Sequence, residues 1–217
     1  GIEPHLTRSE MSTGAVLALF RGGDRSMVCA RGANDALDEH DLEPAWFSGL
    51  DHLHVSGYAF LSDRQARAAR RAIGLAGAAG ASISVNAPPA GLIAAFGVGA
   101  FLRELRRVTT LFLNRDEGRL VTGIDAPEEI VCALAVIHAE GALTLGRDGA
   151  LAWLGQERNA ASPPAALDVD PTGAGDAYAA AFVVHRLEGD TLGEANRAAC
   201  AAAHAHLARP SVAAPPS

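Results

Sequence analysis

The chain has 217 residues, of which 49% are hydrophobic and 20% charged, and its formal net charge is −7. This length accommodates one domain with a sizeable core, or two small ones at most, and no apolar run approaches the ~20 residues of a membrane helix, which excludes a membrane span. All 18 basic residues are arginine; the absence of lysine excludes phosphate-loop NTPase, protein-kinase and Schiff-base mechanisms, which depend on a lysine side chain.

Short β-like runs alternate with longer alanine-rich helical runs along the chain, and this alternation predicts an α/β sandwich. The predicted strands are 15–20, 26–30, 52–55, 82–86, 110–113, 142–145 and 150–153. The predicted helices are 63–79, one within 92–107, 127–140, 175–188 and 191–208. Ser62 or Asp63 begins the first helix, and Gly80 ends it in the left-handed conformation. The residues 212–217 are predicted to be a frayed tail.

The strongest chemical signal is Asp-Val-Asp-Pro-Thr-Gly-Ala-Gly-Asp at 168–176, which runs directly into a predicted helix. Small residues let the backbone approach a ligand, and a helix N-terminus binds anions without any lysine. Asp176 could take the proton from an attacking hydroxyl while neighbouring amides stabilise charge on a phosphoryl group. Taken alone, a Gly-x-Gly-Asp turn fits an aspartate that only caps a helix.

The longer motif at 170–176 resembles the second signature of the ribokinase-like (PfkB) carbohydrate kinases, which transfer the γ-phosphoryl group of ATP to a sugar hydroxyl. Three weaker similarities occur in the family's order. Asn-Arg-Asp-Glu at 114–117 resembles its Asn-x-x-Glu segment, and Thr-Leu-Gly-Arg-Asp-Gly at 144–149 resembles its Thr-x-Gly-x-x-Gly nucleotide loop. The segments 12–14 and 31–34 resemble the return of the sugar-covering lid. The resemblance spans nearly the whole chain.

This resemblance implies a ribokinase-like α/β fold: a central, mostly parallel sheet flanked by helices, with a remnant of a small β lid at the N-terminal end. The kinase domain would cover 1–211, with 12–34 belonging to the lid. Asp176 would be the catalytic base and contact the substrate. The amides that would form the anion hole belong to Gly173, Ala174 and Gly175.

The resemblance also assigns the cofactors, which would be ATP and Mg²⁺. Asn114 and Glu117 would act near magnesium and the phosphates, with Glu117 reaching the metal mostly through water, as suits a hard cation that keeps its water ligands. The ATP phosphates and ribose edge would be lined by Thr144, Gly146 and Gly149.

Two further assignments concern a second metal and the acceptor. Asp170 and the carbonyl of Thr172 fall where many relatives bind a monovalent cation such as K⁺. Gly32 and Asn34 would contact the substrate from the lid, although they could equally form a plain turn. Without the other motifs, Asn114 and Glu117 would fit an Asx turn and a helix-start carboxylate.

The chain departs from the family pattern at its start. Relatives begin with a long portion that carries a Gly-Gly-Asn sugar-binding segment and an early aspartate, and its loss would expose a sheet edge and an apolar face. Cys200 stands where many relatives place an asparagine. The chain is either a degenerate paralogue or lacks parts of a longer protein, and we expect the second.

The remaining residues give weaker signals. The pairs His52 with His54 and His204 with His206 lack a third ligand at suitable spacing and fit ordinary histidines better than a metal site. Tyr58 could stack on a substrate or belong to the core, and 97–99 lacks the third glycine of a dinucleotide fingerprint, which favours a loop. Asn86 opens a loop at a strand's carboxyl end, where ligands usually bind.

The cysteines, Cys29, Cys132 and Cys200, lie far apart and form no C-x-x-C pair, which is typical of a reducing compartment. No charged segment followed by an apolar one opens the chain, so no signal peptide is predicted and we expect a cytoplasmic protein. The negative charge argues against nucleic acid as a partner.

Together these features predict an ATP- and Mg²⁺-dependent kinase of a small sugar or sugar acid, with a homodimer through the lid as a further expectation. One alternative is a non-catalytic nucleotide-binding remnant that kept the turn at 173–176. Another is a nucleoside or pyrimidine-alcohol kinase of the same fold. Measuring ADP release with a panel of acceptors separates the three.

Overall fold

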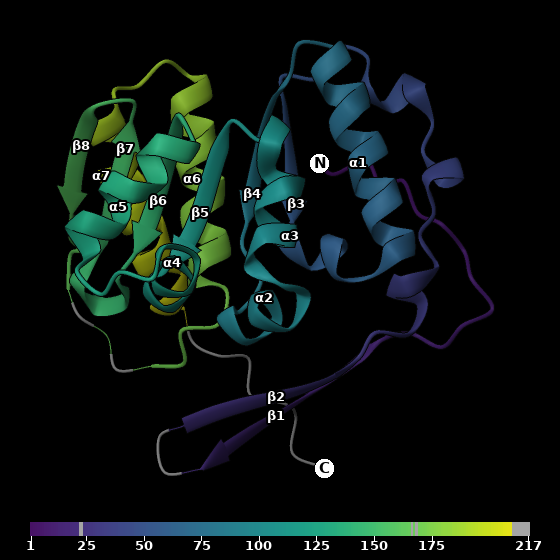
Figure 1. Cartoon of the computed structure of the whole chain (residues 1–217), viewed down its shortest axis with the longest axis horizontal. Coiled ribbons are helices and arrows are strands. Elements are labelled where there is room, and N and C mark those ends of the chain that lie inside the picture. The colour runs from purple at the N-terminus through teal and green to yellow at the C-terminus, as the bar shows by residue number, and fades with distance from the viewer. Residues whose placement is uncertain (22–23, 166, 168, 210–217) are drawn as a thin grey trace.

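The structure is a computed structural model that describes residues 1–21, 24–165, 167 and 169–209. Asp168 and the predicted tail 212–217 lie outside the described residues. In the described part, a sheet with helices on both faces forms the body, and a two-stranded hairpin projects from it (Figure 1).

The body is built on a six-stranded sheet whose strands pair in chain order. The strands are β3 (His52–Ser56), β4 (Ser82–Asn86), β5 (Thr110–Asn114), β6 (Glu140–Thr144), β7 (Ala150–Leu154) and β8 (Glu157–Ala161). The first four run parallel, and β7 and β8 continue the sheet antiparallel. The prediction of a mostly parallel sheet is therefore confirmed, and the carboxyl ends of β3 to β6 lie along one edge.

Strand β5 shows why the sheet is covered on both faces. Leu111 and Leu113 are buried in one apolar cluster and Phe112, which lies between them, is buried in the other, as the two-residue period of a strand requires. The larger cluster lies under α1 (Asp63–Ala78), α2 (Ala90–Phe96), α3 (Val98–Glu104), α4 (Arg115–Thr122) and α5 (Pro127–Ile137).

The second cluster lies under α6 (Ala174–Leu187) and α7 (Leu192–Leu207), which contact each other closely. Alanines line both sides of this layer: Ala142 and Ala152 on the sheet, and Ala195 and Ala199 on α7, are fully buried. Small side chains let helix and sheet backbones approach, which is why this alanine-rich part of the chain packs as core. Tyr178 and Phe182 of α6 stack on each other and pack edge-on against Phe112.

Several predicted boundaries were wrong. The helix expected within 92–107 is split into α2 and α3 by Gly97, which adopts φ +95°. The loop expected at 97–99 is therefore a loop only at Gly97, because Val98 and Gly99 begin α3. Helix α5 ends at Ile137 and β6 begins at Glu140, so residues 138–140 do not continue the helix and the strand starts before 142.

Other elements had not been predicted. Strand β8 carries polar residues on an edge and lacks a continuous apolar run, and α4 is short and highly charged. The described residues also include six 3₁₀ helices: η1 (Gly32–Ala36), η2 (Glu39–Asp41), η3 (Pro44–Phe47), η4 (Gly57–Leu61), η5 (Leu105–Arg107) and η6 (Gly146–Asp148). Such short turns leave no periodic pattern for sequence analysis to find.

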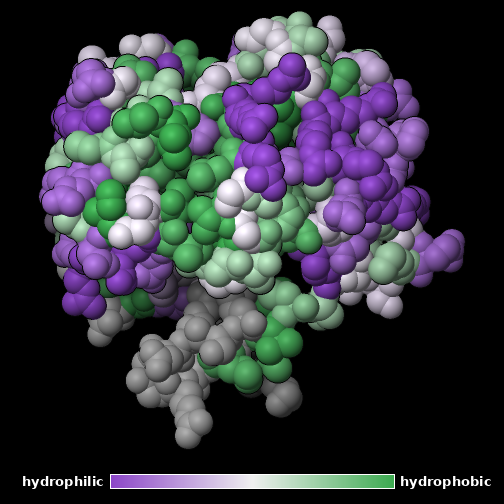
Figure 2. Space-filling view, in the orientation of Figure 1, coloured by the Kyte–Doolittle hydropathy of each residue, from purple (hydrophilic) through white to green (hydrophobic). Residues whose placement is uncertain are grey.

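The hairpin consists of β1 (Ala15–Arg21) and β2 (Asp24–Ala30), paired antiparallel from Ala15 opposite Ala30. It lies below the body in Figure 1, and Figure 2 shows apolar surface in the same region. Leu17, Leu19 and Val28, which the register places on one face of the hairpin, remain 49–59% exposed. A two-stranded ribbon has little stability of its own, so this small sheet, predicted as lid-related, presents an uncovered apolar face.

Among the described residues, no helix combines the length and apolar character needed to cross a bilayer.

Candidate active site

The carboxyl edge of the parallel strands brings the predicted nucleotide residues together. Asn114 and Thr144 end β5 and β6 and lie directly opposite each other in the sheet register. An open pocket of about 580 Å³ begins at these two residues. Its walls are formed by Asn114, Thr144, Gly146, Arg147, Gly149, Pro163, Ala165, Leu167, Val169, Pro171, Ala174, Gly175, Tyr178, Cys200, Ala203, His204 and Leu207. The predicted nucleotide loop at 144–149 and the start of α6 thus face one cavity.

The loop after β6 depends on two glycines. Gly146 and Gly149 adopt φ values of +62° and +94°, which other residues rarely adopt. A Cβ atom on Gly149 would lie 2.0 Å from the carbonyl oxygen of Ala161 on β8. The amide of Leu145 donates to the Gly149 carbonyl at 2.7 Å and closes the loop. Backbone hydrogen bonding therefore fixes this wall of the pocket, and its two glycines place no side chains in the cavity.

Asn114 and Glu117 form a reciprocal cap at the start of α4. The Asn114 Oδ1 atom accepts from the Glu117 amide at 2.9 Å, and the Asn114 amide and Nδ2 donate to the two carboxylate oxygens at 2.8 and 2.7 Å. This is the capping-box pattern. Glu117 is only 6% exposed, and burial raises its pKa to about 7, although the bond from the Asn114 amide opposes the shift. The structure therefore forms the helix-start arrangement that the sequence also allowed for these residues, and Asn114 lines the adjacent pocket.

Magnesium fits this pair of residues. A buried carboxylate whose partners are amide groups gains from a nearby cation, because burial alone disfavours its ionised form. The carboxylate and amide oxygens are the hard donors that Mg²⁺ prefers, and Mg²⁺ usually retains several waters.

The turn before α6 is held by its own hydrogen bonds. The carboxylate of Asp170 accepts from the Thr172 amide at 3.1 Å and from the Thr172 hydroxyl at 2.6 Å. Gly173, at φ +82°, precedes the first turn of α6, and the Ala174 amide donates to the Pro171 carbonyl at 3.1 Å. One of the three amides predicted for the anion hole is thus engaged within the turn. For the amides of Gly173 and Gly175, the structure gives no hydrogen-bond partner in the part of the chain it describes.

Asp176 lies in the first turn of α6 and meets the end of β4. Its Oδ1 atom accepts a hydrogen bond of 2.9 Å from the Nδ2 of Asn86. Asp176 also affects two side chains near the end of β3. Burial lowers the pKa of His54, and the negative charge of Asp176 partly offsets this shift. Burial raises the pKa of Tyr58, and the charge of Asp176 raises it further. The contact with Asn86 had not been predicted; its position at a strand's carboxyl end was the available signal.

Gly32 and Asn34 lie where the hairpin rejoins the body. Gly32 has φ +54°, and a Cβ atom there would lie 2.4 Å from the Ser12 carbonyl. The Ala33 amide donates to that same carbonyl at 2.8 Å, and Gln65 of α1 donates to the Asn34 carbonyl. The plain turn that the sequence allowed is therefore formed, and it anchors the root of the hairpin to α1.

The paired histidines have structural partners. His52 contacts the hydroxyls of Ser82 and Ser84 at 2.6 and 2.7 Å, and His54 contacts Ser84 at 2.7 Å. His204 contacts the Ala165 carbonyl and His206 contacts the Thr172 carbonyl, each at 3.1 Å.

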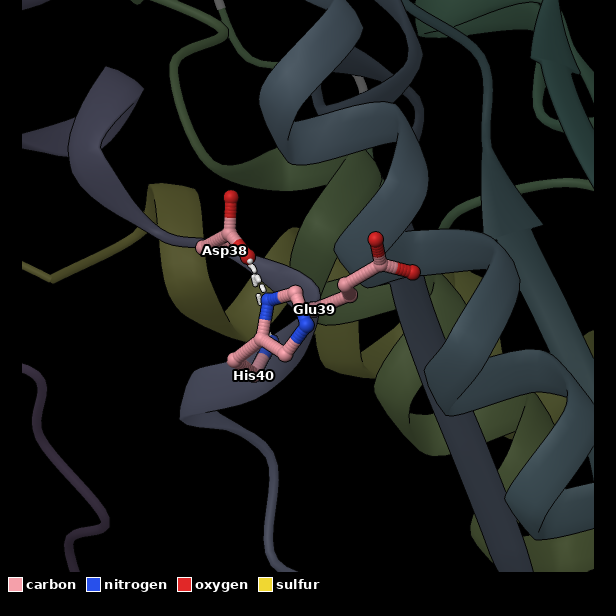
Figure 3. A group of neighbouring side chains, drawn as sticks. All are labelled: Asp38, Glu39 and His40. Carbon is pink, nitrogen blue, oxygen red and sulfur yellow. Dashed lines mark hydrogen bonds and ion pairs between the residues drawn. The ribbon is translucent and has the colours of Figure 1, made fainter.

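Within the described residues, one group of three side chains could hold a metal ion by proximity, namely Asp38, Glu39 and His40 (Figure 3). The Asp38 carboxylate already accepts from the His40 ring at 2.7 Å and pairs with Arg64 at 3.1 Å and Arg67 at 3.6 Å. The bond from His40 lowers the pKa of Asp38 to about 2. This cluster caps η2 and pairs with α1, which explains it without a metal.

The floor of the pocket contains a buried polar network that the sequence had not indicated. The Tyr178 hydroxyl donates to the Oδ1 of Asn196 at 2.6 Å, and the Asn196 Nδ2 donates to the Asn159 side chain at 2.9 Å. Asn196 is fully buried. Cys200 lies one turn further along α7, beside this network, and burial raises the pKa of its thiol to about 11. The network fixes the Tyr178 ring, which lines the pocket.

Comparison with known proteins agrees with this architecture. The profile described as "pfkB family carbohydrate kinase" matches residues 2–217. A cytidine kinase of Thermococcus kodakarensis is 35% identical over 103 residues, which cover 44% of this chain and 36% of that protein. The crystal structure of adenosine kinase from Sinorhizobium meliloti superposes with a TM-score of 0.84 at 26% identity, covering 92% of this chain and 63% of that one.

A putative ribokinase II from E. coli, solved in complex with ATP and Mg²⁺, has a TM-score of 0.82 at 21% identity, covering 93% of this chain and 66% of that one, and shares the fold. The chain thus spans about a third of the length of the curated relative and under two thirds of the adenosine kinase.

Proposed function

Because the chain belongs to the pfkB family of carbohydrate kinases, we propose that it carries the nucleotide site and the catalytic turn of an enzyme that transfers the γ-phosphoryl group of ATP to an alcohol. The acceptor is the hydroxyl of a small sugar or sugar acid. The observation that supports this most directly is the convergence of the nucleotide loop, Asn114 and the start of α6 on one pocket.

In this mechanism, Asp176 accepts the proton of the acceptor hydroxyl as that oxygen attacks the γ-phosphorus, while the bond from the γ-phosphorus to the bridging oxygen of the β-phosphate breaks and ADP leaves. The Asn86 bond to Oδ1 leaves Oδ2 to face the hydroxyl. The amides of Gly173 and Gly175, at a helix N-terminus, stabilise the negative charge on the transferring group. Ala174 contributes by shaping the turn, because its amide is bonded to Pro171.

Thr144, Gly146 and Gly149 would line the site of ATP in this pocket. Glu117, beside Asn114, would hold Mg²⁺ through water, and the ion would supply positive charge to the phosphate oxygens. Gly32 and Asn34 join the lid to the body, so they set the position from which the hairpin covers the acceptor.

A nucleoside acceptor is a second candidate. The cytidine kinase match, at 35% identity, and the adenosine kinase match, at 26%, are both to proteins named for nucleosides. Both candidates require the same transfer to an alcohol and differ only in what surrounds the hydroxyl.

The test is ADP release by the purified chain with ATP, Mg²⁺ and a panel of sugars, sugar acids and nucleosides. The change Asp176→Asn should reduce kcat by about 10²- to 10⁴-fold, since general-base catalysis supplies about that factor, while ATP affinity is largely kept. The matched control is Asp125→Asn, which removes a surface carboxylate paired with Arg119 at 2.6 Å and should leave kcat unchanged.

Wild-type turnover by Asp176→Asn would remove this residue from the mechanism. ATP binding without ADP release for any acceptor would favour a nucleotide-binding protein that has lost catalysis.

A further inference from the structure

The last turn of α7 lies against the turn that precedes α6. The Nε2 atom of His206 is 3.1 Å from the carbonyl oxygen of Thr172. A carbonyl oxygen can only accept a hydrogen bond, so Nε2 must carry the proton in this contact. His206 therefore donates a hydrogen bond into the 170–176 motif from a helix 34 residues further along the chain.

The histidine ring also packs on the next residue of the turn. A Cβ atom on Gly173 would lie 2.5 Å from Nε2 and 3.1 Å from Cε1 of His206. Gly173 has φ +82°, so both its conformation and the space above its α-carbon require glycine. The imidazole thus holds two successive residues: it bonds the carbonyl of Thr172 and covers the α-carbon of Gly173.

This contact bears on the monovalent cation that the sequence assigned to Asp170 and Thr172. A cation there would place positive charge against the Thr172 carbonyl and fix its direction. An imidazole N–H does the same with a bond dipole, and the Asp170 carboxylate is already bonded to the Thr172 amide and hydroxyl. The two ligands assigned to K⁺ are thus each engaged within the chain: the Thr172 carbonyl by His206, and Oδ1 of Asp170 by Thr172.

We propose that His206 takes the place of a monovalent cation in this chain, so that the turn before α6 keeps its shape without K⁺. His206 is then a positioning residue: it acts through Thr172 and Gly173 on the amides proposed to bind phosphate, and touches neither nucleotide nor acceptor. This inference rests on the proposed function only in assuming that the turn binds phosphate. The contact between His206 and Thr172 is independent of that function.

Thermal unfolding tests this without any kinase assay. Wild-type chain, His206→Ala, His206→Gln and His204→Ala are unfolded in KCl, NaCl and choline chloride at matched ionic strength. The wild type should melt at the same temperature in all three salts. His206→Ala should melt about 2–4 °C lower, the usual effect of losing one hydrogen bond in a chain of this size, and should regain part of that loss in KCl only. His204→Ala is the control, because His204 bonds the Ala165 carbonyl instead.

The glutamine variant keeps an N–H donor and should restore the wild-type behaviour. Nitrogen NMR gives a direct signature: the His206 ring should show a protonated Nε2 that is unaffected by exchanging NaCl for KCl.

A K⁺-specific rise in the melting temperature of the wild type would overturn the proposal, as would a His206 ring protonated only at Nδ1. These results are separate from those for catalysis. If no acceptor is phosphorylated, the proposed function fails while the salt response and the NMR signature still decide the role of His206.

Discussion

The burial of Glu117 predicts a step in stability with pH. The pKa of this carboxyl rises from its ordinary value of 4.5 to about 7 in the folded chain, chiefly because burial disfavours the ionised form. The fold therefore binds the proton more tightly than the unfolded chain does. The stabilisation by the protonated form is complete below pH 4.5 and is lost as pH rises through about 7.

The size of the step follows from the two pKa values. At about 1.4 kcal/mol per pKa unit, the rise from 4.5 to about 7 corresponds to about 3 kcal/mol of unfolding free energy. Glu117→Gln removes the ionisation but keeps the size of the side chain. It also turns an NH₂ group toward the Asn114 amides, which costs about 1 kcal/mol for the hydrogen bond lost.

The variant should therefore be less stable than the wild type by about 1 kcal/mol near pH 4.5 and more stable by about 2 kcal/mol near pH 8. Urea unfolding of both proteins across this range gives the difference in unfolding free energy at each pH. Because all other groups titrate alike in the two proteins, their contributions cancel in this difference. Glu129→Gln, at an exposed position in the first turn of α5, is the control for removing a surface carboxylate.

A difference between wild type and Glu117→Gln that stays constant with pH would refute this reasoning. The same measurement with Mg²⁺ and ATP present bears on the proposed metal role: a nearby cation favours the ionised carboxylate, so the step should move to lower pH.

Two further results are expected. Gly141→Ala should cost at least about 3 kcal/mol of unfolding free energy, because its Cβ would lie 2.3 Å from the Leu111 carbonyl and 2.4 Å from the Trp153 ring; Gly91→Ala in α2, with open space around it, should be neutral or stabilising in the same urea titration. Alkylation near pH 8 should modify Cys29 and Cys132, which are exposed, far faster than buried Cys200, whose thiol pKa is about 11. Mass spectrometry after timed quenching identifies each site, and equal rates at all three thiols would contradict the burial of Cys200.

The elements that follow from the local pattern of apolar and turn residues could be predicted from the sequence. Strand β4 was predicted at its observed bounds, because its buried apolar residues lie between clear turn signals. Helix α4 was not, because Asn114 and Glu117 stabilise it by a cap and its buried face includes a charged residue and a glycine. Strand β8 forms because β7 supplies a hydrogen-bonding partner. Its own sequence does not show that pairing, so the strand could not be predicted from local pattern.

The same division applies to the site. The motif at 170–176 and the loop at 144–149 could be located from residue types and order, since their glycines answer local backbone needs. The contacts of Asn86 with Asp176 and of His206 with Thr172 join residues 90 and 34 positions apart. Nothing in either neighbourhood of the sequence specifies the other, so they became visible only when the sheet edge and the two helices were in place.

Strands that are neighbours in the sheet are also neighbours along the chain, from β3 to β8. Each pairing therefore closes only the loop of its own connection, which costs less ordering entropy than pairing strands from distant parts of the chain would. During synthesis, the preceding strand with which each new strand pairs has already left the ribosome. The 170–176 turn follows all six strands along the chain, and His206, which bonds it, comes later still, so the contacts of this turn are completed only after α7 has been made.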